Sequence, residues 1–86
     1  MARFKIIIAR SASKELEALP RSVIEKIVVE IENLADHPFP KGSKKLKGEK
    51  NRWRIRVGDY RIIYSILVKE LIIDIIRIRR RKEAYN

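Results

Sequence analysis

The chain has 86 residues, in which 21 lysines and arginines outnumber 11 acidic residues and give a net charge of +10. This balance favours nucleic acid, an anionic surface or an acidic protein as the partner. With no cysteine and a single histidine, the sequence excludes disulfides, thiol chemistry, multi-histidine zinc sites and histidine-based triads. No segment resembles a signal peptide or a membrane span, so we expect one cytoplasmic domain over residues 1–86.

The N-terminal part of the chain predicts one strand followed by two helices. Apolar residues alternate with other residues over residues 3–8, which indicates a strand. Ser11 fits the N-cap of a short helix over residues 12–19. Apolar residues then recur every three or four positions over residues 21–36. This period predicts a longer helix, although many of its side chains are β-branched.

Residues 37–43 contain two prolines and a glycine, which predicts a loop without regular structure. Lysines crowd this loop and the segment after it, and we expect them to form a flexible basic arm that leads into the next strand. They are Lys41, Lys44, Lys45, Lys47 and Lys50. The alternative is a solvated loop without a specific function.

Residues 52–57 carry the strongest functional indication in the chain. Arginines and apolar residues alternate here, so a strand would have one cationic face and one apolar face. The arginines are Arg52, Arg54 and Arg56, and the apolar residues are Trp53, Ile55 and Val57. Gly58 and Asp59 then fit a two-residue turn, with glycine where a type II′ turn requires positive φ. The sequence therefore predicts a hairpin whose second strand covers residues 60–67.

This turn predicts the register of the hairpin, with Val57 opposite Tyr60 and Arg56 opposite Arg61. Like charges directly opposite each other destabilise a strand pair, so such a face is typical of a surface that binds an anion. Arginine suits phosphate because its planar guanidinium donates two parallel hydrogen bonds. The alternative is a solvated sheet face, but a face that is merely solvated would mix charges of both signs.

The C-terminal part of the chain predicts a last strand and a cationic end. Residues 71–78 are almost all aliphatic, which indicates a strand buried on both faces at the centre of the sheet. We expect Asp74 within it to pair with a neighbouring basic side chain. Tyr85 is a candidate platform for stacking on an unpaired base, or an aromatic ring folded back on the core. Five cations lie between Asp74 and Tyr85, at Arg77, Arg79, Arg80, Arg81 and Lys82.

The predicted order of elements is strand, helix, helix and three strands. Two amphipathic helices have to cover an apolar sheet face. The expected fold class is therefore α+β, with a mainly antiparallel four-stranded sheet and both N-terminal helices packed on one face. No pair of nearby carboxylates suited to a divalent metal is visible, so a metal-dependent nuclease is disfavoured and no cofactor is implied.

Three segments resemble the RelE branch of the RelE/ParE toxin superfamily. They are Leu46-Lys-Gly48, Trp53-Arg-Ile-Arg-Val-Gly-Asp-Tyr-Arg-Ile-Ile-Tyr64 and Arg81-Lys-Glu-Ala-Tyr85. The resemblance implies the toxin of a type II toxin–antitoxin system, an endoribonuclease that cuts mRNA in the ribosomal A site and is neutralised by an acidic, RelB-like antitoxin. It also implies a metal-independent reaction. In this reaction the 2′-hydroxyl attacks its own phosphodiester and leaves a 2′,3′-cyclic phosphate and a 5′-hydroxyl.

Position by position, the resemblance implies a catalytic set made of Arg54, Arg56, Arg61, Arg81 and Tyr85. We expect further contacts to RNA or phosphate from Arg52, Lys44, Lys45, Lys47, Arg79 and Arg80. Some members of the family carry lysine at the positions of Arg54 and Arg56, and many carry histidine at that of Arg80. Arginine is a poor proton acceptor, so the identity of the general base stays open.

Two other functions stay open at this point. A ParE-type toxin that poisons gyrase would have the same fold without RNA chemistry, and a catalytically degenerate member would bind RNA without cutting it. The arginine set favours the RelE-type activity. We expect a heteromeric toxin–antitoxin complex and no association with a membrane.

Overall fold

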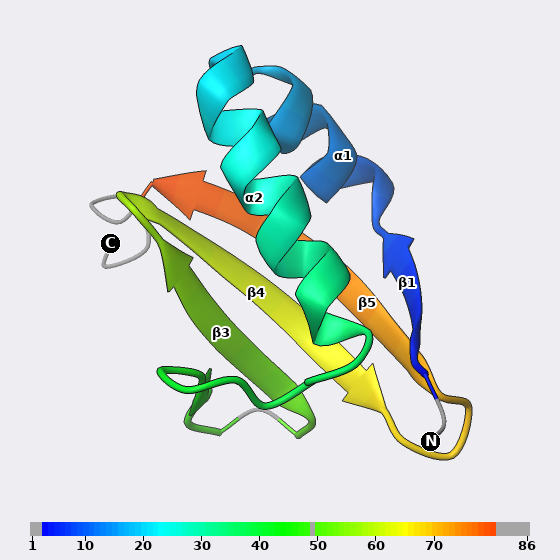
Figure 1. Cartoon of the computed structure of the whole chain (residues 1–86). Helices are drawn as coiled ribbons and strands as arrows, with labels where there is room; N and C mark the ends of the chain where they lie inside the picture. The colour runs from blue at the N-terminus through cyan, green and yellow to red at the C-terminus, as the bar shows by residue number, and fades with distance from the viewer. Residues whose placement is uncertain (1–2, 49, 81–86) are drawn as a thin grey trace.

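The computed structural model describes residues 3–48 and 50–80 (Figure 1). In this part of the chain the strands are β1 (Lys5–Ile8), β2 (Lys44–Lys45), β3 (Arg52–Val57), β4 (Tyr60–Leu67) and β5 (Ile72–Arg80), and the helices are α1 (Arg10–Glu17) and α2 (Arg21–Leu34). The strands form one sheet in the order β1-β5-β4-β3-β2, and Figure 1 shows both helices on one face of it. The predicted α+β class is confirmed.

The sheet has one strand more than the sequence predicted. β1 runs parallel to β5, and the other neighbours in the sheet are antiparallel. The additional strand is β2, in which Lys44 lies opposite Arg54 and Lys45 lies opposite Trp53. The expectation of a flexible basic arm is therefore wrong for these two lysines, because they extend the edge of the sheet.

Two contacts hold the loop before β2 against the sheet. The hydroxyl of Tyr64, which is fully buried, donates a hydrogen bond of 2.9 Å to the carbonyl oxygen of Pro38. The rings of Phe39 and Trp53 meet edge to face, with centroids 4.7 Å apart. Burial raises the pKa of Tyr64 to about 12, and a side-chain hydrogen bond with Ser43 acts in the opposite direction. The loop has no regular structure, as predicted, but it is anchored.

The change from β1 to α1 occurs earlier than predicted. Ala9, and not Ser11, is the N-cap residue of α1, and no side chain caps this helix. The amide of Ala9 donates to the carbonyl of Ile75 in β5, and the carbonyl of Ala9 accepts from the amide of Ser13, both at 2.8 Å. One residue thus ends the strand pairing and opens the helix, which leaves Ser11 inside the first turn.

The core lies between the helices and the face of the sheet that they cover. α1 contributes Ala12 and Leu16, α2 contributes Ile27, Ile31 and Leu34, and the sheet contributes Ile55, Ile62, Tyr64, Ile66, Ile73, Ile75 and Ile78. The helical residues follow the three-to-four period that the sequence shows, so burial of this stripe explains why a β-branched segment forms a helix. None of the described helices is long and apolar enough to span a membrane.

Strand β5, which lies between β1 and β4 and not at the centre of the sheet, differs from its prediction at both ends and in its middle. Leu71 has φ +56° and lies in the turn before the strand, and the strand continues to Arg80. Ile63 lies opposite Arg77 while Tyr64 lies opposite Ile75, so one extra residue of β5 forms a bulge. The outward side chains of β5 are partly or fully exposed, so the predicted burial on both faces is wrong.

Candidate functional site

The β3–β4 hairpin has the geometry that the sequence predicted. Gly58 has φ +58°, as the first central position of a type II′ turn requires. Val57 lies opposite Tyr60, and Arg56 lies opposite Arg61. Because Ile55 and Ile62 point into the core, the arginines between them point to the opposite side of the sheet.

The side of the sheet opposite the two helices (Figure 1) carries a cluster that we call the arginine face. Its members are Arg52, Arg54, Arg56, Arg61, Arg77 and Arg79. Arg56, Arg61 and Arg79 form one row across three neighbouring strands. In the next row Arg54 and Arg77 flank Ile63. A row of guanidinium groups at the spacing of strands can engage an anion from several sides at once.

Burial differs between Arg54 and Arg56, two of the three arginines of β3. Arg54 is only 7% exposed, whereas Arg56 is exposed. Both line a cavity of about 370 Å³ at the edge of the sheet, to which Lys41, Lys44 and the carboxylate of Glu30 on α2 also contribute. The cavity joins the arginine face to the lysines of the anchored loop, so the positive charge continues around the edge of β3.

Arg77 belongs to the arginine face, whereas the sequence placed it only among the cations at the end of the last strand. Simple alternation from Ile73 and Ile75 would turn Arg77 toward the core. The bulge changes the parity of the strand, so that Ile78 points inward and Arg77 outward, opposite Ile63. The buried isoleucines of β5 are spaced by two residues and then by three, but the isoleucines at positions 72 and 76 hide this spacing in the sequence.

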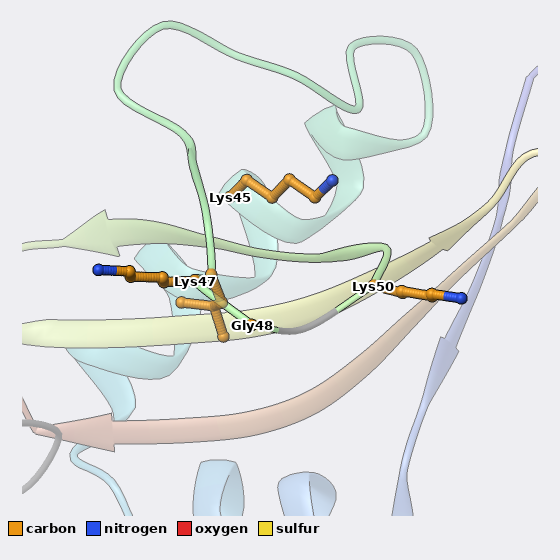
Figure 2. Close-up of a pocket in the computed structure, with 5 residues that line it drawn as sticks. Lys45, Lys47, Gly48 and Lys50 are labelled. Atoms are coloured by element: carbon orange, nitrogen blue, oxygen red, sulfur yellow. The ribbon is translucent and has the colours of Figure 1, made fainter.

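The predicted phosphate-binding lysines do not all lie on this face. Lys45 lies opposite Trp53 and therefore on the other side of the sheet from Lys44. A shallow pocket of about 530 Å³ is lined by Lys45, Leu46, Lys47, Gly48 and Lys50. Figure 2 shows Lys47 pointing to the opposite side from Lys45 and Lys50, so the three side chains do not converge on a single ion. Their arrangement suits contacts spread along an extended polyanion.

Four further predicted residues have different outcomes. Arg80 lies opposite Tyr60, so alternation places it on the opposite side from Arg79. Arg81 and Tyr85 lie outside the described residues. Asp74 lies opposite Ser65, and no hydrogen-bond partner for its buried Oδ1 is found among the described residues, so its pairing with a basic side chain stays a prediction. Within residues 3–48 and 50–80 no cluster of histidine and carboxylate groups suited to a metal ion is found.

Comparison with known proteins places the chain among toxins. A family model described as the ParE toxin of type II toxin–antitoxin systems, parDE, matches residues 6–85. The protein named "Putative toxin RelE1" of Methanocaldococcus jannaschii is 37% identical over 87 residues. The alignment covers 98% of this chain and 97% of that protein.

Solved structures agree with this result. A chain of the archaeal RelE–RelB complex from Pyrococcus horikoshii OT3 superimposes with a TM-score of 0.83 at 28% identity, covering 92% of this chain and 96% of that one. A chain of the RelB–RelE antitoxin–toxin complex from Methanococcus jannaschii gives a TM-score of 0.77 at 30% identity, with coverages of 92% and 94%. The likeness therefore extends over nearly the whole chain in both sequence and fold.

Proposed function

The chain belongs to the RelE/ParE superfamily of toxins from type II toxin–antitoxin systems, and on this premise we propose that it is a ribosome-dependent endoribonuclease that cuts mRNA in the A site. The observation that carries the proposal is the row of Arg56, Arg61 and Arg79 across three strands. A toxin that acts on gyrase has no evident need for this row, whereas cleavage of a phosphodiester requires stabilisation of negative charge. We treat residues 1–86 as one toxin domain.

In the proposed reaction the RNA itself supplies the nucleophile, the electrophile and the leaving group. The 2′-oxygen forms a bond to the adjacent phosphorus while the bond from phosphorus to the 5′-oxygen of the next nucleotide breaks. The 2′-hydroxyl loses its proton, and the departing 5′-oxygen gains one. The products are a 2′,3′-cyclic phosphate and a 5′-hydroxyl.

The contribution of the protein is then mainly electrostatic. Negative charge on the phosphate oxygens increases as the 2′-oxygen attacks, and preorganised guanidinium groups stabilise this charge without moving. Arg54, Arg56 and Arg61 have this role in the proposal. Arginine stays protonated near neutral pH, so these groups act as clamps and not as proton acceptors. Arg81 and Tyr85 join the proposed site on the strength of the family resemblance.

We propose a RelB-like antitoxin as the partner. The structural relatives from Pyrococcus horikoshii and Methanococcus jannaschii were both solved as complexes of RelE with RelB. A net charge of +10 suits an acidic partner, because complementary charge accelerates association and selects against basic competitors. An acidic segment bound over the arginine face would also exclude RNA from it.

A gyrase poison is the second candidate, because the family model that matches carries the ParE description. Expression of the free chain separates the two functions. We expect growth arrest with cuts inside A-site codons, detected by primer extension on a translated message, and no cutting of the same message without ribosomes. Intact messages together with inhibited DNA supercoiling by purified gyrase would establish the second function. Intact messages with active gyrase, but with retained RNA binding, would indicate a degenerate member.

A further inference from the structure

Glu15 on α1 contacts the end of the arginine face from the edge of the sheet. β1 pairs with β5 only as far as Ile75, so beyond that residue no described strand lies beside this edge of β5. Glu15 occupies the edge instead. Its Oε1 accepts a hydrogen bond of 3.0 Å from the amide of Ile78, and its Oε2 accepts one of 3.1 Å from Nε of Arg79. One carboxylate thus binds the backbone of β5 and an adjacent guanidinium.

This contact has a different character from an ordinary surface ion pair. The side chains of Arg79 and Glu15 are 40% and 26% exposed, whereas those of Arg21 and Glu25 on α2 are 93% and 70% exposed, with a longer N–O distance of 3.6 Å. An exposed ion pair such as Arg21 with Glu25 contributes little to the stability of the fold. Glu15 is in addition anchored by the amide of Ile78, so its carboxylate has a defined position from which to hold Arg79.

The position of Arg79 gives this contact a functional consequence. Arg79 lies opposite Arg61 in the row that ends at Arg56. A long arginine side chain next to other cations would move away from them, because like charges repel and the side chain has many rotamers. Glu15 engages Nε, so the four N–H donors of the terminal NH₂ groups stay outside this contact.

We propose that Glu15 is a positioning residue that holds the guanidinium of Arg79 at the end of the row formed with Arg56 and Arg61, ready to bind the RNA phosphate. The inference rests on the proposed function and adds α1 to the elements that shape the site. Removal of the charge of Glu15 would have two effects. The surface would become more positive, and the side chain of Arg79 would no longer be held in place. Binding of RNA should stay equal or become tighter, and cleavage should become slower.

The test compares two glutamates of the same helix. Glu15→Gln keeps an oxygen acceptor for the amide of Ile78 and removes the charge, and Glu17→Gln makes the same charge change at an exposed position. Single-turnover cleavage is measured on programmed ribosomes, and affinity is measured with a message whose 2′-deoxy substitution prevents cleavage. We expect Glu15→Gln to cut about tenfold more slowly without weaker binding, and Glu17→Gln to cut within about twofold of the wild type.

A double variant tests whether Glu15 affects cleavage through Arg79. In an Arg79→Ala background, Glu15→Gln should cause no further loss of rate. An undiminished rate in Glu15→Gln, weaker binding that accompanies the slower rate, or the same tenfold loss in the Arg79→Ala background would each overturn the inference.

A readout independent of cleavage separates this inference from the proposed function. The ¹H–¹⁵N resonance of Arg79 Nε should be protected from exchange in the wild type and in Glu17→Gln, and should lose protection in Glu15→Gln. Retained protection in Glu15→Gln would show that Glu15 does not hold Arg79. A wild type that never cuts mRNA would overturn the proposed function, while the resonance would still decide whether Glu15 positions Arg79.

Discussion

The two faces of the β3–β4–β5 sheet have opposite properties, although consecutive residues of the same strands supply them. Ile62 is fully buried against the helices, and its neighbour Arg61 lies in a row of arginines on the other side. On the inner face apolar side chains leave water, which stabilises the fold. On the outer face like charges lie opposite one another, which destabilises the strand pairs.

The comparison indicates how a chain of 86 residues can hold a costly charge cluster in place. A domain of this size buries a modest share of its surface, so its net stability is small. The alternation of a strand lets each residue of the inner face offset a charged neighbour on the outer face. Stability and the proposed activity should therefore be separable by mutating adjacent positions.

The largest effect is expected from Ile62→Ala on the inner face. Truncation of a fully buried isoleucine removes apolar contacts and leaves a cavity, which should lower the free energy of unfolding by about 2–5 kcal/mol. Urea denaturation followed by circular dichroism measures this change. A loss below about 1 kcal/mol would mean that the inner face does not carry the stability that its burial suggests.

Arg61→Ala, one residue away, should lower the rate of cleavage strongly and the stability only slightly. We expect single-turnover cleavage of ribosome-bound mRNA to fall about 10²–10³-fold, since one positioned electrostatic group can contribute this much. The free energy of unfolding should change by less than about 1 kcal/mol. Arg81→Ala is expected to lose activity in the same way. Cleavage at the wild-type rate in a folded Arg61→Ala protein would place the site elsewhere.

The two faces of the hairpin could be predicted because residues close together in the sequence determine them. Alternation over residues 52–57 and a glycine at a two-residue turn suffice to set the register of β3 and β4. The same reasoning failed for β5, where one extra residue reverses the parity and brings Arg77 to the arginine face. The partner strand determines such a bulge, so inspection of one segment at a time does not reveal it.

Long-range contacts explain the remaining differences. Lys44 and Lys45 form β2 because the loop before them is anchored by Tyr64 and by the contact of Phe39 with Trp53. Neither contact has a signature in the lysine-rich segment itself. Glu15 on α1 is equally remote in sequence from Arg79, and only the folded chain brings them together.

Tyr64 offers a pH test of the inner face, because it is a titratable side chain within the apolar core. Its pKa is raised to about 12 in the folded chain, while an unfolded tyrosine titrates near 10. The stabilisation is complete below pH 10 and should be lost progressively above it, by about 2 kcal/mol near pH 12.

Tyr64→Phe lacks this ionisation, and it also lacks the hydrogen bond to Pro38. The variant should be about 1 kcal/mol less stable at neutral pH and less sensitive to alkali. Lysines titrate in both proteins, so the difference between the two denaturation series isolates Tyr64. Parallel curves between pH 9 and pH 12 would contradict the assignment.

Modest effects are expected from lysine substitutions on β3, and they sharpen the description of the outer face itself. If Arg54 and Arg56 clamp phosphate with their planar forks, Arg54→Lys and Arg56→Lys should each slow cleavage by about 1–2 kcal/mol of lost charge-assisted hydrogen bonding. The loss should be greater at Arg54, which is only 7% exposed, because an ammonium group is more strongly hydrated than a guanidinium.

The opposite outcome has a clear chemical meaning. A lysine among so many cations can have a lowered pKa and accept the proton of the 2′-hydroxyl, which arginine cannot do. Single-turnover rates across a pH series distinguish the two cases, since a base adds a titration that a clamp does not. A lysine variant that cuts faster than the wild type, at either position, would show that these sites lack a base and would replace the clamp assignment. We expect both variants to be slower, because bidentate geometry is what arginine adds to a charge that lysine already has.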